Sequence, residues 1–412
     1  MHESVPMRPG LNVFLLTVSA LLFSWSPTHA HSTGEHASLL HGDPSESFEP
    51  SSEFGFNERA DTVTELGILR RAVRLLPNVP EYRLKLADAL LRVGDLDAAI
   101  EECRAAIRLQ QDDGRAYLQL GLLFSAKQDW RAAVSALTEA IRLEPNLPHA
   151  HYSLGHVHYS LGDVTAAVQS YRQALELYPH FPDAHYRLAL LLRVIGQTQE
   201  AARHMGAAAI DGVPQARFFL GNAYKDGQGV EKNLGLAIFW WMQAIELGQQ
   251  TAYDSLSKLR RQTLAPGLTT QRRMELLKGL QSYRTILWND YPDMSRVSDR
   301  QSLGKVLLGQ GRGEEAFWVL IKECAALGEE AHTELASLYE AGFAPSLKPF
   351  DKRILACFES TAADGFVPAK KFLAPIYAKG LGLDPDTPKA KALLKDLPKR
   401  ETKSLLNELG LR

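Results

Sequence analysis

The sequence has no excess of charge of either sign. Lys and Arg number 46 against 48 Asp and Glu, which gives a formal net charge of -2 over 412 residues. A protein that binds nucleic acid through its phosphates needs a surplus of basic side chains. We therefore expect no nucleic-acid partner. Hydrophobic residues at 45% and charged residues at 23% are ordinary for a folded soluble chain, and they argue against disorder throughout or several membrane spans.

Cysteines and catalytic motifs are also scarce. Three scattered cysteines, Cys103, Cys324 and Cys357, exclude a zinc ribbon or a small fold held by disulfides. The sequence contains no Gly-x-Ser-x-Gly elbow, no His-Glu-x-x-His and no phosphate-binding loop. The glycine-rich run 309–313 follows no strand pattern, so it predicts a loop. We expect no enzyme, no catalytic residue and no cofactor.

Long hydrophobic runs are missing as well. The longest candidate, Leu11 to Trp25, has 15 residues, whereas a membrane-spanning helix needs about 20. Together with Arg8 before it and Thr28-His29-Ala30 after it, the run predicts a signal peptide over residues 1–30, cleaved before His31. No cysteine follows that point, so no lipid anchor is expected. We expect an exported protein, periplasmic or secreted, without a membrane span after cleavage; retention of the segment as an anchor stays open.

A repeat of 34 residues organises the chain from residue 62 onward. The period appears in one leucine ladder and two alanine ladders, and in a glycine ladder in which Gln128 replaces one glycine. The ladders are Leu86, Leu120, Leu154, Leu188; Ala99, Ala133, Ala167, Ala201; Ala106, Ala140, Ala174, Ala208; and Gly94, Gln128, Gly162, Gly196. In three units an aspartate directly follows the glycine-ladder position, namely Asp95, Asp129 and Asp163. We expect each of them to cap the second helix of its unit.

This pattern resembles the tetratricopeptide repeat. The resemblance implies an all-α, right-handed solenoid of stacked helix-turn-helix units, in which small residues lie where two helices approach. It covers residues 62–212, with a half unit followed by full units at 80–113, 114–147, 148–181 and 182–212. Residues 31–61 before it are rich in His, Ser, Glu, Gly and Pro and predict a flexible lead-in.

A second pattern begins at Val213 and resembles the Sel1-like repeat. It rests on Leu220-Gly221, Tyr224, Gly227, Gly229 and Trp240-Trp241, and it recurs near Leu373, Tyr377 and Gly380. We predict Sel1-like repeats over 213–395, interrupted by an irregular helical insertion at 249–300, and a C-terminal helix at 396–412. Trp240 and Trp241 are expected to pack in the core.

The first helices of such a solenoid line a concave wall. The second, fifth, ninth and twelfth residues of each unit lie on that wall by helical period. An apolar and aromatic strip rimmed by arginine is typical of a surface that binds protein. We predict an adaptor or scaffold that binds a partner protein or peptide through Arg115, Leu118, Leu122, His149, Tyr152, His156, Tyr159, Tyr186, Leu190 and Arg193.

Three questions stay open at this stage. The histidines at 31, 36 and 41 and at 149, 151, 156 and 158 suggest, as an alternative, extracytoplasmic handling of copper or zinc, although we assign no metal ligands. Cys324 and Cys357 fall on second helices of consecutive Sel1-like units, so a disulfide between them is possible. The sequence names neither the partner nor the oligomeric state.

Overall fold

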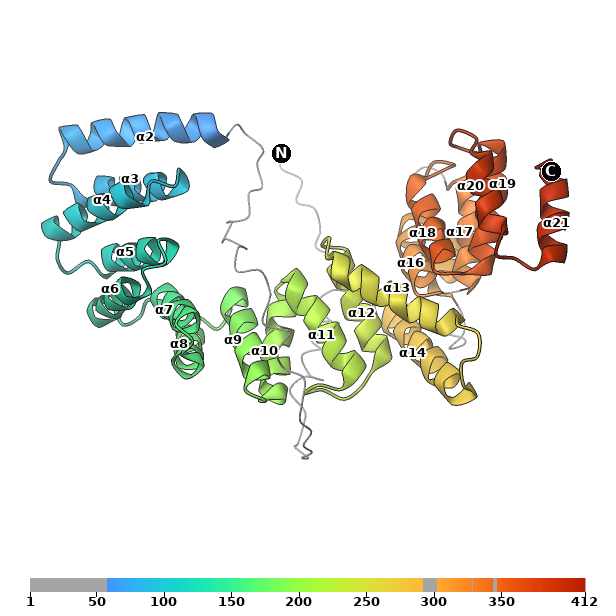
Figure 1. Ribbon diagram of the computed structural model, residues 1–412, viewed down its shortest axis with the longest axis horizontal. Coiled ribbons are helices and arrows are strands. Elements are labelled where there is room, and N and C mark those ends of the chain that lie inside the picture. The colour runs from blue at the N-terminus through green and yellow to red at the C-terminus, as the bar shows by residue number, and fades with distance from the viewer. Residues whose placement is uncertain (1–57, 292–301, 328, 344–346, 412) are drawn as a thin grey trace. The chain divides into compact units, whose positions relative to one another are not determined.

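The computed structural model describes residues 58–291, 302–327, 329–343 and 347–411, with side chains from residue 64 onward. These residues form 20 helices and no strand; a single bridge pairs Phe343 with Leu347. They divide into two compact units, the N-terminal unit within Pro27–Ala208 and the C-terminal unit from Ala209 onward (Figure 1). Among the described helices, none is both apolar enough and long enough to span a bilayer. The all-α solenoid is confirmed.

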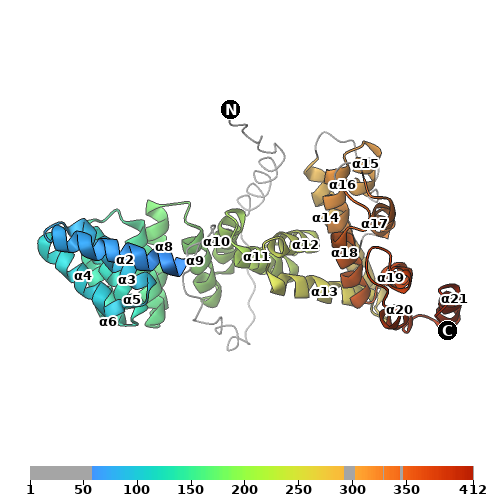
Figure 2. The ribbon, with the colours of Figure 1, turned by 90° about the horizontal axis from the view of Figure 1, so that it is seen from above.

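Helix hairpins build the N-terminal unit, and they follow one another along both views (Figures 1 and 2). Each hairpin pairs a first helix with a second one, and the next first helix packs on the second helix of the preceding unit. The helices are α2 (Glu58–Leu75), α3 (Pro80–Arg92), α4 (Leu96–Leu109), α5 (Gly114–Ala126), α6 (Trp130–Leu143), α7 (Pro148–Ser160), α8 (Val164–Leu177), α9 (Pro182–Val194) and α10 (Thr198–Ile210). The predicted lead-in overlaps α2, which begins at residue 58, whereas residues 1–57 lie outside the described part.

Small residues set the spacing within these hairpins. A Cβ atom added to Gly155 would lie 2.9 Å from the ring of Tyr171, and one added to Gly121 would lie 2.6 Å from the Leu137 side chain. Both distances are shorter than carbon atoms tolerate, so only glycine permits this approach. The ladder alanines of the second helices are buried from Ala99 through Ala208. The predicted small-residue contact between first and second helices is confirmed.

The turns inside the hairpins follow the predicted chemistry. Gly94, Gly162 and Gly196 have φ angles of 82°, 83° and 81°, and Gln128 takes the same left-handed region at 61°. Glycine enters that region without the steric cost that a side chain brings. One residue later, the carboxylates of Asp95, Asp129 and Asp163 accept hydrogen bonds from the amides of Ala98, Ala132 and Ala166, which caps the second helices.

The C-terminal unit starts with a hairpin of α11 (Pro214–Asp226) and α12 (Leu234–Ile245). Helix α11 ends at Gly227 in the left-handed region, with φ of 76°. Trp240 and Trp241 are 4% and 1% exposed, so their predicted place in the core is confirmed. The indole of Trp241 also donates a hydrogen bond to the Asn222 side chain of α11 at 3.2 Å.

The segment predicted as an irregular insertion forms two regular helices, α13 (Gln250–Leu264) and α14 (Thr270–Asn289). Both pack on α12. Gly235 of α12 and Gly279 of α14 each lie close against the other helix: a Cβ on Gly235 would lie 2.8 Å from the Tyr283 amide nitrogen, and one on Gly279 would lie 2.5 Å from the Leu234 side chain. The two glycines let the helices approach to backbone distance, so α14 is an integral layer of this unit.

Seven further helices complete the C-terminal unit. They are α15 (Leu303–Gly309), α16 (Gly313–Ala325), α17 (Glu329–Ala341), α18 (Lys352–Ala363), α19 (Val367–Lys379), α20 (Thr387–Leu394) and α21 (Lys399–Glu408). A disulfide joins Cys324 of α16 to Cys357 of α18, whose Cα atoms are 7.0 Å apart. The terminal helix α21 lies outermost and covers Leu394 and Leu397 with its own leucines.

Candidate functional site: the wall of first helices

The candidate site lies on the first helices of the N-terminal unit. Helix α3 packs on α5, and α5 packs on α7, so this row is closely spaced along the stack. The second helices α4, α6 and α8 instead contact the first helices on either side of them. A stack curves toward its more closely spaced row, which makes the first helices the inner wall. We call this surface, formed by α3, α5, α7 and α9, the concave wall.

The predicted residues differ in how far they reach into solvent. Leu122 on α5 and Tyr159 on α7 are 41% and 40% exposed, which is high for large apolar side chains. Arg115 and His149 are exposed as well. The other predicted residues are half-buried, namely Leu118, Tyr152, His156, Tyr186, Leu190 and Arg193. The wall therefore consists of a half-buried floor from which a few large side chains project.

Tyr152 belongs to that floor. Its ring lies 5.6 Å from the ring of Tyr171 and 4.8 Å from that of Phe181, both of which are buried. Burial raises the pKa of the Tyr152 phenol. Phe181 also meets His149, with ring centroids 5.1 Å apart. Tyr152 thus supports the packing of α7 against α8 and α9, and truncating it would disturb the wall itself.

Arg187 is a wall residue that the predicted site lacks. It is half-buried on α9 and interacts with the Tyr152 hydroxyl. Burial acts to lower the pKa of Arg187, but the phenols of Tyr152 and Tyr171 outweigh it and raise that pKa. Arg187 forms no ion pair with a carboxylate among the described residues. The equivalent position in the other repeats carries Lys85, Gln119 or Ser153. An arginine at this repeat position is therefore the sequence feature that could have identified Arg187.

His156 shares this environment. Burial, and then the nearby Arg187 cation, lower the pKa of the His156 imidazole. Its ring lies 6.3 Å from that of Trp130. The lowered pKa favours the uncharged imidazole, which contributes hydrogen-bonding capacity beside a permanent positive charge. Phenol, imidazole and guanidinium groups thus lie together on the wall, where they can form hydrogen bonds and aromatic contacts.

The histidines of α7 do not converge on a common point. His149 meets Phe181, and His151 Nε2 lies 3.2 Å from the Pro145 carbonyl oxygen. Across the described ranges, no group of three or more His, Cys, Asp or Glu side chains is placed to hold a metal ion. His31, His36 and His41 lie outside those ranges. The described structure thus offers the metal-handling alternative no site.

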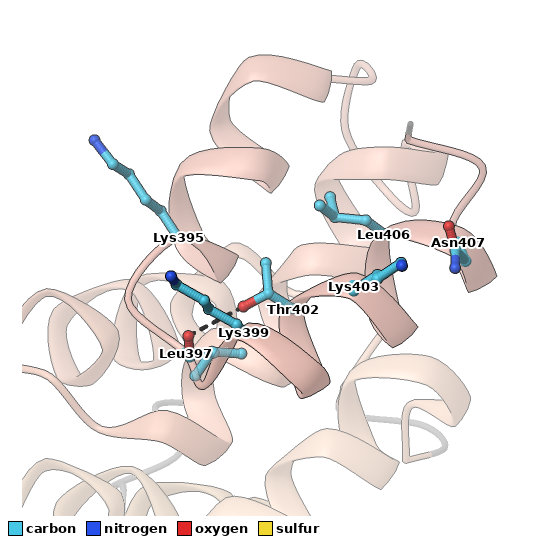
Figure 3. Close-up of a pocket in the computed structure, with 7 residues that line it drawn as sticks. All are labelled: Lys395, Leu397, Lys399, Thr402, Lys403, Leu406 and Asn407. Atoms are coloured by element: carbon cyan, nitrogen blue, oxygen red, sulfur yellow. Dashed lines mark hydrogen bonds between the residues drawn. The ribbon is translucent and has the colours of Figure 1, made fainter.

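A second surface feature lies at the C-terminal end of the C-terminal unit (Figure 3). A pocket there is lined by side chains of α21 and of the turn before it, namely Lys395, Leu397, Lys399, Thr402, Lys403, Leu406 and Asn407. Leu397 is buried, and the lysines are exposed.

Comparison with known families agrees with the repeats. A tetratricopeptide repeat model matches residues 66–114, 118–182 and 152–217. A Sel1 repeat model matches residues 214–249 and 368–395. The two kinds of repeat predicted from the ladders and glycines are therefore confirmed.

Individual relatives are more distant. A 61-residue stretch is 38% identical to mouse DAP3-binding cell death enhancer 1, but the alignment spans 15% of this chain and 12% of that protein. Among solved structures, MamA is 26% identical over 37% of this chain and 91% of its own, with a TM-score of 0.35. YrrB, described as a tetratricopeptide protein with an unusual peptide-binding site, is 22% identical. The match covers 43% of this chain and 91% of YrrB, with a TM-score of 0.36. PilF of Pseudomonas aeruginosa is 20% identical over 54% of this chain and 91% of its own, with a TM-score of 0.38.

Proposed function

Because this chain carries tetratricopeptide and Sel1 repeats, we propose that it is a non-enzymatic adaptor or scaffold that binds a segment of a partner protein on the concave wall. Proteins built from these repeats generally act as protein-interaction scaffolds. The repeats supply a rigid surface on which several side chains keep fixed spacing, which lowers the ordering cost of binding. The function proposed for this chain is therefore recognition.

One observation carries the proposal. Leu122 and Tyr159 project into solvent above a floor that contains the contacting, mutually tilted rings of Tyr152 and Phe181. A partner that covers these side chains removes apolar surface from water, and the hydrophobic effect makes that removal favourable for binding. Aromatic residues with arginine beside them are the usual energetic anchors of protein interfaces, and Arg187 supplies the arginine here.

The proposed location is outside the cytoplasm, in the periplasm or the secreted fraction. The support is the apolar run Leu11 to Trp25 with its small-residue boundary at Ala30. N-terminal sequencing of the protein purified from its native host tests this location. We expect the mature chain to begin at His31 in the extracytoplasmic fraction. A chain that begins at Met1 and stays with the cytosol would contradict it.

Affinity capture tests the function. The bait is the full chain, compared with the double variant Leu122→Ser with Tyr159→Ser, and bound proteins are identified by mass spectrometry. The two side chains are 41% and 40% exposed, so we expect the variant to fold normally and to lose a protein that the native chain retains. The matched control is Leu109→Ser with Leu177→Ser, which removes two exposed leucines from second helices. Equal recovery with all three baits would contradict binding at the wall.

A further inference from the structure

Helix α2 lies at the N-terminal end of the stack and exposes one of its faces (Figure 1). The other second helices α4, α6 and α8 each pack on two first helices, their own and that of the next unit. Helix α2 occupies the place of a second helix, because it directly precedes α3 and packs there through Leu66, Leu69 and Val73. Among the described residues, no first helix precedes α2. The side of α2 that a first helix of its own would cover is therefore exposed.

The repeat period identifies the contact that Ile68 lacks. Steps of 34 residues from Ile68 lead to one position on each later second helix, namely Glu102, Ala136, Ser170 and His204. Glu102 pairs with Arg83 of α3, the first helix of its own unit, at 2.8 Å. Likewise, His204 Nδ1 lies 2.8 Å from His185 Nδ1 of α9. The alanine and the serine at this position are buried, whereas Ile68 is 63% exposed.

Ala72 and Leu75 extend the exposed face that Ile68 begins. They follow it by four and seven residues, a spacing that places all three side chains in one stripe along the helix. The ladder alanines equivalent to Ala72 are buried from Ala106 through Ala208, whereas Ala72 is half-buried. Leu75 is 69% exposed, more than its equivalent leucines, of which Leu109 at 43% is the most exposed. We call Ile68, Ala72 and Leu75 the α2 stripe.

The surface around the α2 stripe is basic. Arg70, Arg71 and Arg74 are exposed, and they form no ion pair with any residue that the structure describes. The one acidic side chain described on α2, Glu65, pairs with Arg92 at 2.8 Å and so leaves these arginines without a counter-charge. A second copy of the chain would bring like charges together at this face. The charge therefore favours an acidic partner over self-association.

We propose that the α2 stripe binds an acidic amphipathic helix of a partner protein, in the place where the other units hold their own first helix. Apolar side chains of that helix cover Ile68 and Leu75, a small residue lies against Ala72, and carboxylates pair with Arg71 and Arg74. The stripe is separate from the concave wall of first helices, so this contact goes beyond the proposed function. It gives the scaffold a second attachment point at the end of its stack.

Residues 329–341, as a labelled synthetic peptide, supply the probe. In the chain this sequence forms α17, which buries one face and has a leucine followed by a small residue, Leu335-Ala336, as the first helix α5 has in Leu120-Gly121. The peptide has four glutamates and no Lys or Arg, so it has the chemistry of the proposed partner. The receptor is the full chain. We expect saturable binding by fluorescence anisotropy that weakens as salt screens the charges.

Two receptor variants test the apolar and the charged parts of the contact. Ile68→Ser with Leu75→Ser should weaken binding about tenfold or more, because the peptide then covers less apolar surface. Arg71→Gln with Arg74→Gln should weaken binding about threefold, which is the size of effect that exposed ion pairs have.

Matched controls remove the same kinds of side chain from other second helices. Leu109→Ser with Leu177→Ser removes two exposed leucines, and Arg108→Gln with Arg131→Gln removes two exposed arginines. Neither control should change binding of the peptide. Circular dichroism of every receptor verifies that the helices still form.

Four results would overturn the proposal. They are no saturable binding to the native chain, equal binding to the Ile68 and Leu75 variant, equal binding of a peptide whose glutamates are changed to glutamines, and a dimer in analytical ultracentrifugation that this variant dissociates. The last result would show that a second copy covers the stripe. Loss of binding with Leu122→Ser and Tyr159→Ser alone would place the peptide on the concave wall, which contradicts this site and leaves the proposed function standing.

Discussion

Arg260 of α13 and Asp364, the residue that follows α18, form an ion pair at 2.6 Å although 104 residues separate them in sequence. Each side chain is only 2% exposed. Asp364 also accepts a hydrogen bond from Ser257, and Arg260 donates to the Ala325 carbonyl at 2.9 Å. The buried polar atoms of Arg260 and Asp364 therefore all have hydrogen-bonding partners. A buried charge is tolerated under this condition. The contact joins α13 to α16 and α18.

Breaking this pair from one side should destabilise the C-terminal unit. Asp364→Asn leaves the Arg260 cation buried without its counter-charge, and such changes cost about 3–5 kcal/mol. We expect a lower midpoint of denaturant unfolding, and faster amide hydrogen exchange in α13 and α18 than in α3 to α9.

The exposed pair Arg272 and Glu275 provides the control for that experiment. These side chains are 46% and 51% exposed and lie 3.0 Å apart. Glu275→Gln should change the free energy of unfolding by about 0.5 kcal/mol or less. If Asp364→Asn and Glu275→Gln lower the free energy of unfolding by the same small amount, burial of Arg260 does not require the Asp364 charge.

Alanine at Gly235 should separate α12 from α14. Its Cβ would lie 2.8 Å from the Tyr283 amide nitrogen, which belongs to helix backbone and has little freedom to move. We expect a destabilisation of about 1–3 kcal/mol by thermal unfolding. Gly67→Ala in α2 should have the opposite sign, because no atom lies within 4 Å of its added Cβ and alanine favours a helix by about 1 kcal/mol. A Gly235→Ala variant as stable as the native chain would contradict the close contact.

The three cysteines should differ in alkylation. Cys324 and Cys357 are joined in a disulfide, and Cys103 is a buried free thiol. Burial, and then the Asp113 carboxylate, raise the pKa of Cys103 to about 12, so little reactive thiolate exists at neutral pH. We expect iodoacetamide to label no cysteine in the folded chain, one after denaturation and three after denaturation with reduction. Mass spectrometry counts the labels, and three labels without reductant would exclude the disulfide.

Acidification should destabilise the N-terminal unit through His204. Burial, and then the neighbouring His185, lower the pKa of His204 from 6.5 to about 4. The unfolded chain therefore takes up this proton at higher pH than the folded one, so stability falls as pH drops from 6.5 toward 4. The loss amounts to at most about 3 kcal/mol.

His204→Gln separates this effect from other titrations. The variant keeps a polar side chain near His185 Nδ1, which lies 2.8 Å from His204 Nδ1 in the native chain. Its unfolding free energy should depend less steeply on pH between 6.5 and 4 than that of the native protein. Parallel pH profiles for the two proteins would show that His204 does not titrate as described.

Local signals predicted much of the fold. Gly94 and Asp95 act through their own backbone and the next turn, so their sequence spacing alone identifies the end of one helix and the cap of the next. The same holds for the ladder alanines, which recur with every hairpin. Helix α14 was predicted only as part of an irregular helical insertion at 249–300, because nothing local shows that Gly235 of α12 and Gly279 lie in the contact between the two helices.

Long-range polar contacts escaped prediction for the same reason. Arg260 sits among other charged residues in α13 and has the sequence context of a solvated side chain, and its partner lies 104 residues away. On the concave wall, helical period predicted which side chains share the face, and Leu122 and Tyr159 are the exposed large apolar ones among them. Helical period did not predict that the ring of Tyr152 contacts that of Phe181, because Phe181 precedes a helix and enters the wall from a turn.

Site-specific photocrosslinking in the native host tests the central claim most directly. A photoreactive phenylalanine analogue replaces Tyr159 on the concave wall or, in a matched strain, Leu177 on a second helix; these side chains are 40% and 37% exposed. The account predicts a discrete adduct with one partner protein from position 159, and none with that protein from position 177. An adduct from position 177 alone, or identical patterns from both positions, would contradict recognition by the concave wall.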